Sequence, residues 1–230
     1  MKFPKQNRKD HGPLEDKYYH LLDQLLIPYQ LMNIETSFGD THIVLIGPKD
    51  KPPLVLLHQE QSNAALVVTA FKNLLQNFRV YAIDIISNHT SAQFVLRKTD
   101  TSYGQWMFEV ITRLNITGGT LVGLNKGGFI AWKSLHFLKS RITSAFLIDP
   151  EGIIAGENYP VITLEEAQCI STPLYMIATI GPPSFAGRKL LAQAKTIFSS
   201  LVATLLLDQT SLTSSVDRYE RITHFIKIQL

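Results

Sequence analysis

The sequence has little cysteine, little net charge and no long apolar run. Its 230 residues include a single cysteine, Cys169, so neither an intramolecular disulfide nor a cysteine-based zinc site can form. The 22 basic and 19 acidic side chains leave a formal charge of +3, which is too small to predict a nucleic-acid partner. No apolar stretch approaches the length of a membrane span. What is present, 45% hydrophobic and 18% charged residues, is typical of a globular protein.

The first twenty residues are charged, but no apolar segment follows them as it does in a secretory signal. We therefore expect a protein of the reducing cytoplasm that binds neither a membrane nor nucleic acid. The basic residues of this segment, at positions 2, 5, 8 and 9, are interpreted as a solvated tail. We expect an N-terminal arm or helix over residues 1–29 and a single domain over residues 30–230.

Strand-like and helix-like segments alternate through that domain. Two extended runs, Leu31–Thr36 and His42–Ile46, are joined by a hairpin signal at Ser37–Asp40. The later strand-like runs are Pro53–His58, Arg79–Ile85, Gly119–Leu124, Ser144–Ile148, Leu174–Thr179 and Ala203–Leu207. Helical patterns fall between and after them, at about 63–77, Tyr103–Leu114, Lys126–Leu138, Arg188–Ser200 and from Ser215. This alternation predicts an α/β fold: a mainly parallel sheet with an N-terminal antiparallel hairpin and helices on both faces.

One turn in this pattern carries chemical information. The buried strand that ends at Leu124 runs into the helix that begins at Lys126 with almost no loop. Gly123 and Gly127 flank the apex, Asn125, and allow the strand and the helix to approach closely. The pattern G-x-N-x-G resembles the G-x-S-x-G nucleophile elbow of the α/β-hydrolase fold.

The resemblance extends beyond the elbow and is greatest to bacterial esterase-like members. The segments 51–58 (KPPLVLLH), 78–86 (FRVYAIDII) and 144–150 (SAFLIDP) follow the order and spacing of that family. The resemblance covers roughly residues 30–230 and implies the α/β-hydrolase fold. The glycine motifs of dinucleotide-binding and phosphate-binding loops are absent from the sequence.

Family members hydrolyse esters with a nucleophile, a histidine and an acid, and this sequence departs from each. Asn125 occupies the nucleophile position, and an amide nitrogen is not a nucleophile. The loop after the last strand, 207–211, lacks the histidine, and His224 on the final helix is interpreted as a partly exposed helical residue. The turn at 180–184 has no carboxylate, although Asp149 stands at a position that some members use.

The turn that supplies the oxyanion hole also differs. The family's His-Gly pair is His58-Gln59 here, and Glu60 adds a negative charge that would oppose an oxyanion. Lys126 either compensates for that charge or is simply an exposed first-turn residue. The resemblance thus implies a remnant ligand site, with no catalytic residue, formed by His58, Gln59, Asn125, Lys126 and Asp149.

The helical cap that usually follows the strand ending at Ile148 is reduced to residues 149–172, which have room for one short helix at about Thr163–Cys169. Either the pocket is open or another chain covers it, so a homo-oligomer or a protein partner is expected over this face. A metal site from His58, Asp84, His89 and Asp149 is the weaker alternative to hydrogen-bonded strand-end residues, because no two of them have helical ligand spacing. We therefore expect no metal and no cofactor.

Three functional hypotheses follow. The first is a catalytically degenerate hydrolase-like protein that serves as a non-enzymatic binding module for a small apolar or acyl ligand, or for a protein. The alternative is a divergent esterase in which His58 or Asp149 activates water without a covalent intermediate. The third is a purely structural or oligomerising subunit, which would have no pocket.

Overall fold

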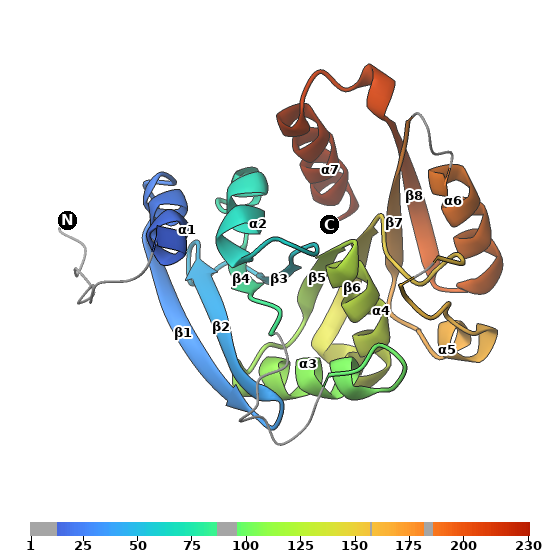
Figure 1. The fold of residues 1–230 in the computed structure, drawn as a ribbon, viewed down its shortest axis with the longest axis horizontal. Helices are drawn as coiled ribbons and strands as arrows, with labels where there is room; N and C mark the ends of the chain where they lie inside the picture. The colour runs from blue at the N-terminus through green and yellow to red at the C-terminus, as the bar shows by residue number, and fades with distance from the viewer. Residues whose placement is uncertain (1–12, 87–95, 157, 182–185) are drawn as a thin grey trace.

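The computed structural model describes residues 13–86, 96–156, 158–181 and 186–230, which form one twisted sheet with helices on both sides (Figure 1). The strand order is β1-β2-β4-β3-β5-β6-β7-β8. The strands are β1 (Tyr29–Thr36), β2 (Gly39–Ile46), β3 (Pro53–Leu57), β4 (Arg79–Ile83), β5 (Gly119–Leu124), β6 (Ile142–Ile148), β7 (Leu174–Ile180) and β8 (Leu201–Asp208). The α-helices are α1 (Pro13–Asp23), α2 (Ala64–Ala70), α3 (Ser102–Arg113), α4 (Lys126–Leu138), α5 (Leu164–Gln168), α6 (Ala186–Ile197) and α7 (Ser215–Gln229).

Strand directions confirm the predicted mixed sheet. Strands β1 and β2 pair antiparallel, β2 and β4 pair antiparallel, and the other neighbours from β4 to β8 are parallel. The hairpin loop is shorter than the predicted turn Ser37–Asp40. Thr36 already pairs with Gly39, so only Ser37 and Phe38 lie between the strands. Gly39 has φ 108°, a left-handed conformation that glycine adopts without steric cost.

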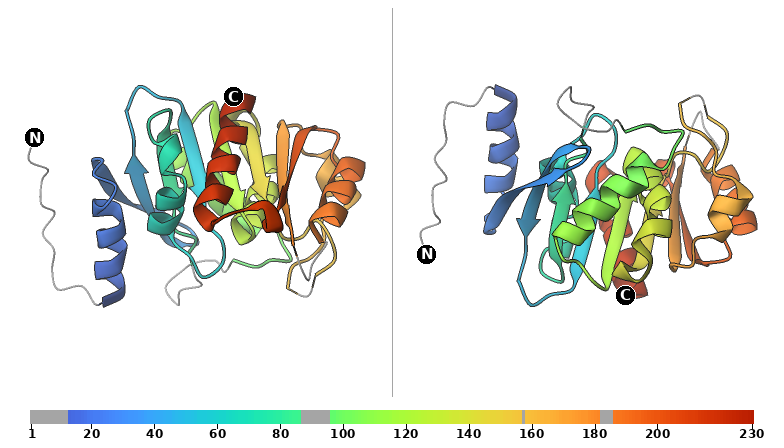
Figure 2. Two further views of the ribbon diagram at one scale, coloured as in Figure 1. Left: turned by 90° about the horizontal axis from the view of Figure 1, so that it is seen from above. Right: turned by 90° about the horizontal axis from the view of Figure 1, so that it is seen from below.

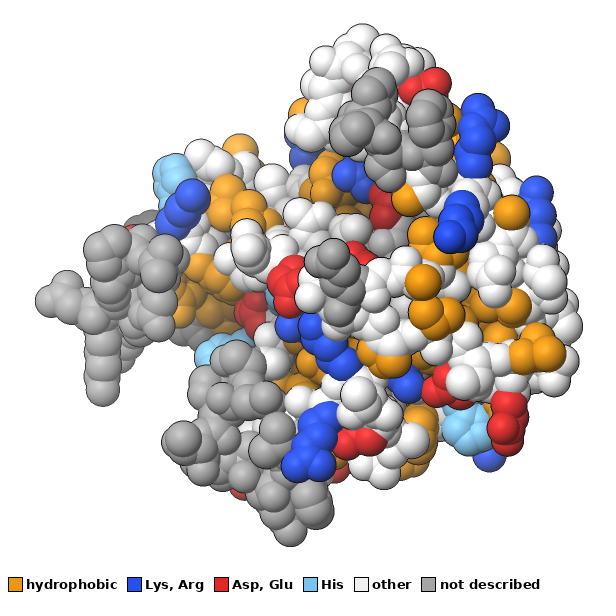
Figure 3. All heavy atoms as spheres, turned by 45° about the vertical axis from the view of Figure 1, so that its right-hand side comes forward, with side chains coloured by type: hydrophobic (Ala, Val, Ile, Leu, Met, Phe, Trp, Pro, Cys, Tyr) orange, Lys and Arg blue, Asp and Glu red, His pale blue; other side chains and the backbone are white. Residues whose placement is uncertain are grey.

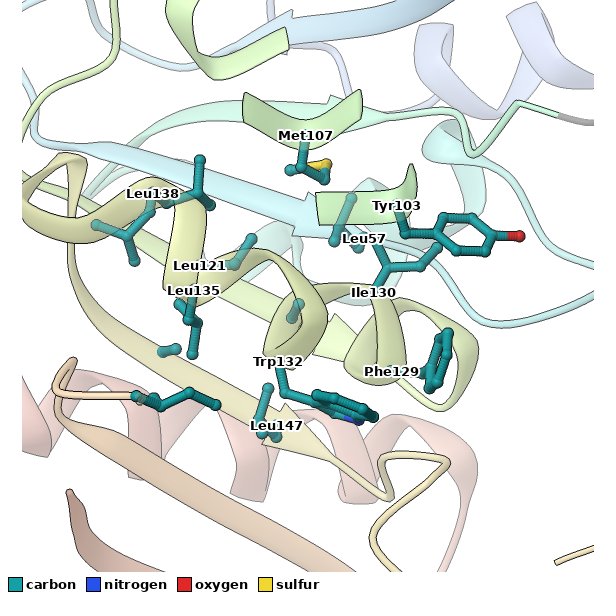
Figure 4. Packing of buried hydrophobic residues seen from close by; sticks show 14 of the residues in the cluster. Leu57, Tyr103, Met107, Leu121, Phe129, Ile130, Trp132, Leu135, Leu138 and Leu147 are labelled. Carbon is teal, nitrogen blue, oxygen red and sulfur yellow. The ribbon is translucent and has the colours of Figure 1, made fainter. Parts of the chain in front are cut away.

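The helices form two layers, each with its own hydrophobic core. Helices α3, α4 and α6 pack on one face of the sheet, and α1, α2 and α7 contribute to the core on the other (Figure 2). Helix α4 is central to its layer, and the side chains of Phe129, Ile130, Trp132 and Leu135 lie among those of neighbouring strands and of α3 (Figure 4). Strand β5 is buried along its whole length between the two cores, as its continuous apolar run predicts.

One predicted boundary is wrong in detail. The helix expected at about 63–77 ends at Ala70 and continues as a 3-10 turn at Lys72–Leu74. The β-branched run Val67-Val68-Thr69 has low helix propensity, and the packing of Phe71 into the core accompanies the change of geometry. In the N-terminal segment, helix α1 is part of the packed body, since Leu22 is fully buried in the α2 and α7 core.

The reduced cap contains one helix, α5, as its length predicts. Its N-terminus has a capping box, in which the Thr163 hydroxyl accepts from Glu166 N and the Glu166 carboxylate accepts from Thr163 N. The segment before α5 packs on helix α4, because the Tyr159 and Phe129 rings lie 4.9 Å apart. Among the described residues, no helix is both long enough and apolar enough to cross a lipid bilayer.

The glycines around the elbow give a first prediction. A Cβ on Gly127 would lie 2.5 Å from the carbonyl oxygen of Leu57, closer than any real contact. Because backbone atoms cannot rotate away, Gly127→Ala should lower the free energy of unfolding by about 3 kcal/mol in urea denaturation. Gly156→Ala is the matched control, since a Cβ there meets no atom within 4 Å. Equal stability of the two variants would contradict the close approach of α4 and β3.

Candidate functional site

The elbow lies at the carboxyl edge of the parallel strands, where such sheets place their sites. Asn125, between β5 and α4, has φ 46° and ψ −105°, an unusual conformation for a residue other than glycine. The bend depends on both flanking glycines, because a Cβ on Gly123 would lie 2.4 Å from the carbonyl oxygen of Gly127. The structure therefore has the backbone of a nucleophile elbow with an amide at its apex.

Hydrogen bonds fix Asn125 to the end of β6. Its backbone N–H donates to the carbonyl of Ile148 at 2.9 Å, and its side-chain Nδ2 donates to the carbonyl of Asp149 at 3.3 Å. Its own carbonyl accepts from Phe129 N within α4 at 2.9 Å and from Glu151 N at 3.3 Å. The apex amide thus joins β5, β6 and α4, which is a positioning role.

His58 lies at the end of β3, buried, with both ring nitrogens bonded to backbone. Nε2 accepts from Ile85 N at 2.9 Å, so the ring proton is on Nδ1 and is donated to the carbonyl of Gln59 at 2.7 Å. Burial lowers the pKa of His58, and nearby Lys126 lowers it further. His58 therefore ties the β3 turn to the β4 turn and has no free nitrogen to take a proton from water.

Asp149 is held by two partners that the sequence analysis did not identify. Its Oδ1 accepts from Thr179 N at 2.6 Å, and its Oδ2 accepts from Thr179 Oγ1 at 2.7 Å. The same Oδ2 forms an ion pair with Arg218 Nη2 of helix α7 at 2.7 Å. Arg218 thus contacts the acid from the C-terminal segment, where the family would supply a histidine.

The described histidines do not complete a triad. His224 faces solvent on α7, as predicted, and makes no contact with Asp149. His89, one of the possible metal ligands, lies outside the described residues. The sequence contains only one feature that could have identified Arg218 as a site residue. It is a cation near the start of the final helix, α7.

The oxyanion turn carries a charged cluster. Lys126 Nζ lies 3.7 Å from Glu60 Oε1, and Tyr159 Oη donates to Glu60 Oε2 at 3.3 Å. Lys98 Nζ lies 3.8 Å from the centroid of the Tyr159 ring. Glu151 is half-buried nearby, and its pKa is raised by burial and by the negative charges of Glu60 and Asp149. Lys126 is therefore ion-paired with Glu60.

The predicted site residues are brought together only in part. Asn125 and Asp149 are bonded, and Lys126 follows Asn125 directly, while His58 lies against the start of α4 because a Cβ on Gly127 would be 2.7 Å from its carbonyl. Asp84 lies close enough to His58 for its charge to act on the imidazole, and its carboxylate accepts from Tyr18 Oη at 2.7 Å and Ala64 N at 2.6 Å. The described residues contain no group of three histidine, cysteine or carboxylate side chains that could hold a metal ion.

Solved structures share this fold. The crystal structure of naproxen esterase (carboxylesterase NP) from Bacillus subtilis superposes with a TM-score of 0.71 at 19% identity, covering 95% of this chain and 100% of that one. Carboxylesterase CesB (YbfK) from the same organism gives a TM-score of 0.70 at 20% identity, covering 91% and 95%. This chain has the α/β-hydrolase fold. Its predicted fold class is thereby confirmed.

Curated relatives extend the likeness of this α/β-hydrolase-fold chain to bacterial esterases. It is 33% identical over 118 residues to the uncharacterized carboxylesterase nap of B. subtilis, and 32% identical over 139 residues to carboxylesterase YbfK. The matches cover 51% and 58% of this chain but only 39% and 47% of the relatives, so it spans less than half of their length. No family model matches it. The chain is esterase-like, and the relatives' names favour the hydrolase alternative over the non-enzymatic hypothesis.

The ion pair between Arg218 and Asp149 gives a second prediction. Arg218→Gln should lower the free energy of unfolding by about 2 kcal/mol, because it leaves a largely buried carboxylate without its charged partner. The matched control on the same helix is Arg221→Gln, which removes an exposed pair with Asp217 and should cost about 0.5 kcal/mol or less. Urea denaturation measures both. Equal losses would show that Asp149 does not depend on Arg218.

The buried His58 gives a third prediction, on pH. Because its pKa is lowered in the folded chain, unfolding takes up a proton, so this contribution to stability is complete above about pH 6.5 and declines as the pH falls below it. The wild-type chain should lose more free energy of unfolding between about pH 7.5 and about pH 5.5 than His58→Gln does. Denaturant unfolding at the two pH values gives the comparison. Parallel losses would exclude His58 as the source.

Proposed function

We propose that this esterase-like chain recognises a carboxylic ester or a related acyl compound at the elbow edge of its sheet. The fold supports this proposal because the elbow and the oxyanion turn keep their mutual placement, with the start of α4 packed against the carbonyls of Leu57 and His58. The curated relatives, which are carboxylesterases, support the same ligand class. Lys126 directly follows the apex in the sequence and would supply a cation for a carbonyl or carboxylate held there.

We further propose that recognition proceeds without an acyl-enzyme. The observation that carries this step is the apex itself, where Asn125 holds the strained elbow conformation but offers no nucleophilic atom. The surroundings support it as well. The Asp149 carboxylate is bonded to Thr179 and Arg218, and among the residues that the structure describes it orients no histidine in the way that covalent catalysis requires.

The second candidate function is hydrolysis of such an ester by direct attack of water, which the names of the curated relatives favour. Of the two bases first considered, His58 has both ring nitrogens committed to backbone, and Asp149 is paired with Arg218. Glu151 is the better base, because burial and neighbouring carboxylates raise its pKa and its backbone bonds to Asn125. Glu151 would take a proton from water as the water oxygen attacks the ester carbonyl. The bond from the acyl carbon to the alcohol oxygen would then break, and protonated Glu151 would return its proton to the departing alkoxide.

A single set of assays tests both candidates and gives the fourth prediction. On the principal proposal, the wild-type chain releases p-nitrophenol from short p-nitrophenyl esters no faster than buffer, and intact-mass spectrometry finds no acyl adduct on Asn125→Ser. Non-hydrolysable ketone analogues of the same esters should raise the unfolding temperature of the wild-type chain, and less that of Lys126→Gln. The control is Lys139→Gln, at the opposite end of α4.

The outcomes separate the candidates. Ester hydrolysis that is abolished by Glu151→Gln, and that rises with pH through a raised carboxyl pKa, would establish the second candidate. An acyl adduct on Asn125→Ser would overturn the account of the elbow. Absence of both hydrolysis and ketone binding would overturn the proposal of an ester or acyl ligand.

A further inference from the structure

A hollow lies between helices α2 and α7, and one of its ends includes Leu124, the residue before the elbow apex. It has a volume of about 390 Å³, within the range of small-molecule sites. Both helices belong to the layer opposite α4, so the sheet separates most of this groove from the elbow core. The groove meets the oxyanion turn only at one end, at Gln59 and Gln61. We call it the α2–α7 groove.

The walls of the α2–α7 groove are mainly apolar. Helix α2 contributes Leu66, Val67 and Ala70, and helix α7 contributes Val216 and Tyr219. Leu66 is 40% exposed and Val216 is 58% exposed, an unfavourable state for two large apolar side chains that line one hollow. The ring of Tyr219 packs edge-on against buried Phe71, with centroids 5.3 Å apart, so this wall is anchored in the core.

The end of the groove away from the oxyanion turn is polar and carries excess positive charge. Lys72 and Glu220 line it there, and the hollow continues into a second one of about 280 Å³ that adds His224 and Lys227. Two lysines against one glutamate leave a net charge of +1 with His224 neutral. On the face drawn in Figure 3, acidic and basic side chains are interspersed. An apolar channel that ends in a cationic pocket is complementary to an amphipathic anion.

We propose that the α2–α7 groove binds a straight-chain carboxylate, with its hydrocarbon chain between Leu66 and Val216 and its carboxylate beside Lys72 and Lys227. The charge at the far end selects the anion, and the exposed apolar walls select the chain. The groove shares Gln59 with the proposed elbow site, but the lysines that would contact the carboxylate, Lys72 and Lys227, lie at its opposite end. A bound carboxylate would bridge α2 and α7 and would bury the two side chains that solvent now reaches.

Calorimetric titration with sodium hexanoate, octanoate and decanoate tests this inference and gives the fifth prediction. Affinity should rise about threefold with each methylene that the groove buries. Val216→Gln should weaken decanoate binding about fivefold, because it places an amide in the apolar wall. Ile228→Gln is the matched control, on the same helix, 61% exposed and outside the groove, and should bind as the wild type does.

Two further measurements test the charge and the location. Lys72→Gln should weaken octanoate binding up to about fivefold and leave the weaker binding of 1-octanol unchanged. In a Lys126→Gln background, which removes the cation of the elbow site, Val216→Gln should still weaken decanoate binding about fivefold. If Lys126→Gln loses decanoate binding and Val216→Gln keeps it, the groove proposal is wrong and the elbow proposal stands. No heat of binding at millimolar decanoate, or equal affinity of Val216→Gln and Ile228→Gln, would also overturn it.

Discussion

The abrupt turn from β5 into α4 is the constraint on which the rest of the structure depends. Strand and helix can approach this closely only because Gly123 and Gly127 lack a Cβ that would meet backbone oxygen. The turn fixes α4 against the carbonyls of Leu57 and His58, so the oxyanion turn, the elbow and the end of β6 share one edge. Asparagine tolerates a positive φ better than most residues do, so Asn125 maintains the bend that the layer of α3, α4 and α6 requires.

Polar groups at this edge serve mainly to join elements to one another. The ring of His58 connects two turns, Asp149 connects β7 to α7 through Thr179 and Arg218, and the side chain of Asn125 reaches β6. Each bond satisfies a buried or half-buried polar group that would otherwise cost free energy. The polar residues of the expected site therefore have largely structural partners here, while Lys126, Glu60 and Glu151 carry charge at the same edge.

The sequence predicts the fold well because the fold depends on patterns that local physics reveals. Continuous apolar runs identify the buried parallel strands, and the glycine spacing around Asn125 identifies the elbow. The site is predicted less completely. Arg218 reaches Asp149 across 69 residues, and Tyr159 reaches Glu60 across 99, and no local pattern reports such distant pairs. Similarly, helix α2 ends at Ala70, where the next residue, Phe71, packs into the core. Helix propensity alone does not predict this tertiary effect.

The residues that determine the fold differ from those that perform the chemistry. This difference explains how a chain with carboxylesterase relatives can have an asparagine at the apex of its elbow. Chains of one fold resemble one another in the residues that the sheet needs in order to form. These are the apolar residues of the buried strands, the glycines and the turn residues. Ester hydrolysis through a covalent intermediate depends in addition on one hydroxyl at the apex and one histidine within reach of it. A change from serine to asparagine removes that hydroxyl and leaves every backbone requirement of the elbow satisfied. The fold can therefore keep the shape of an ester site whether or not the covalent step survives, and what decides the activity is which side chain, if any, can still activate water beside Asn125.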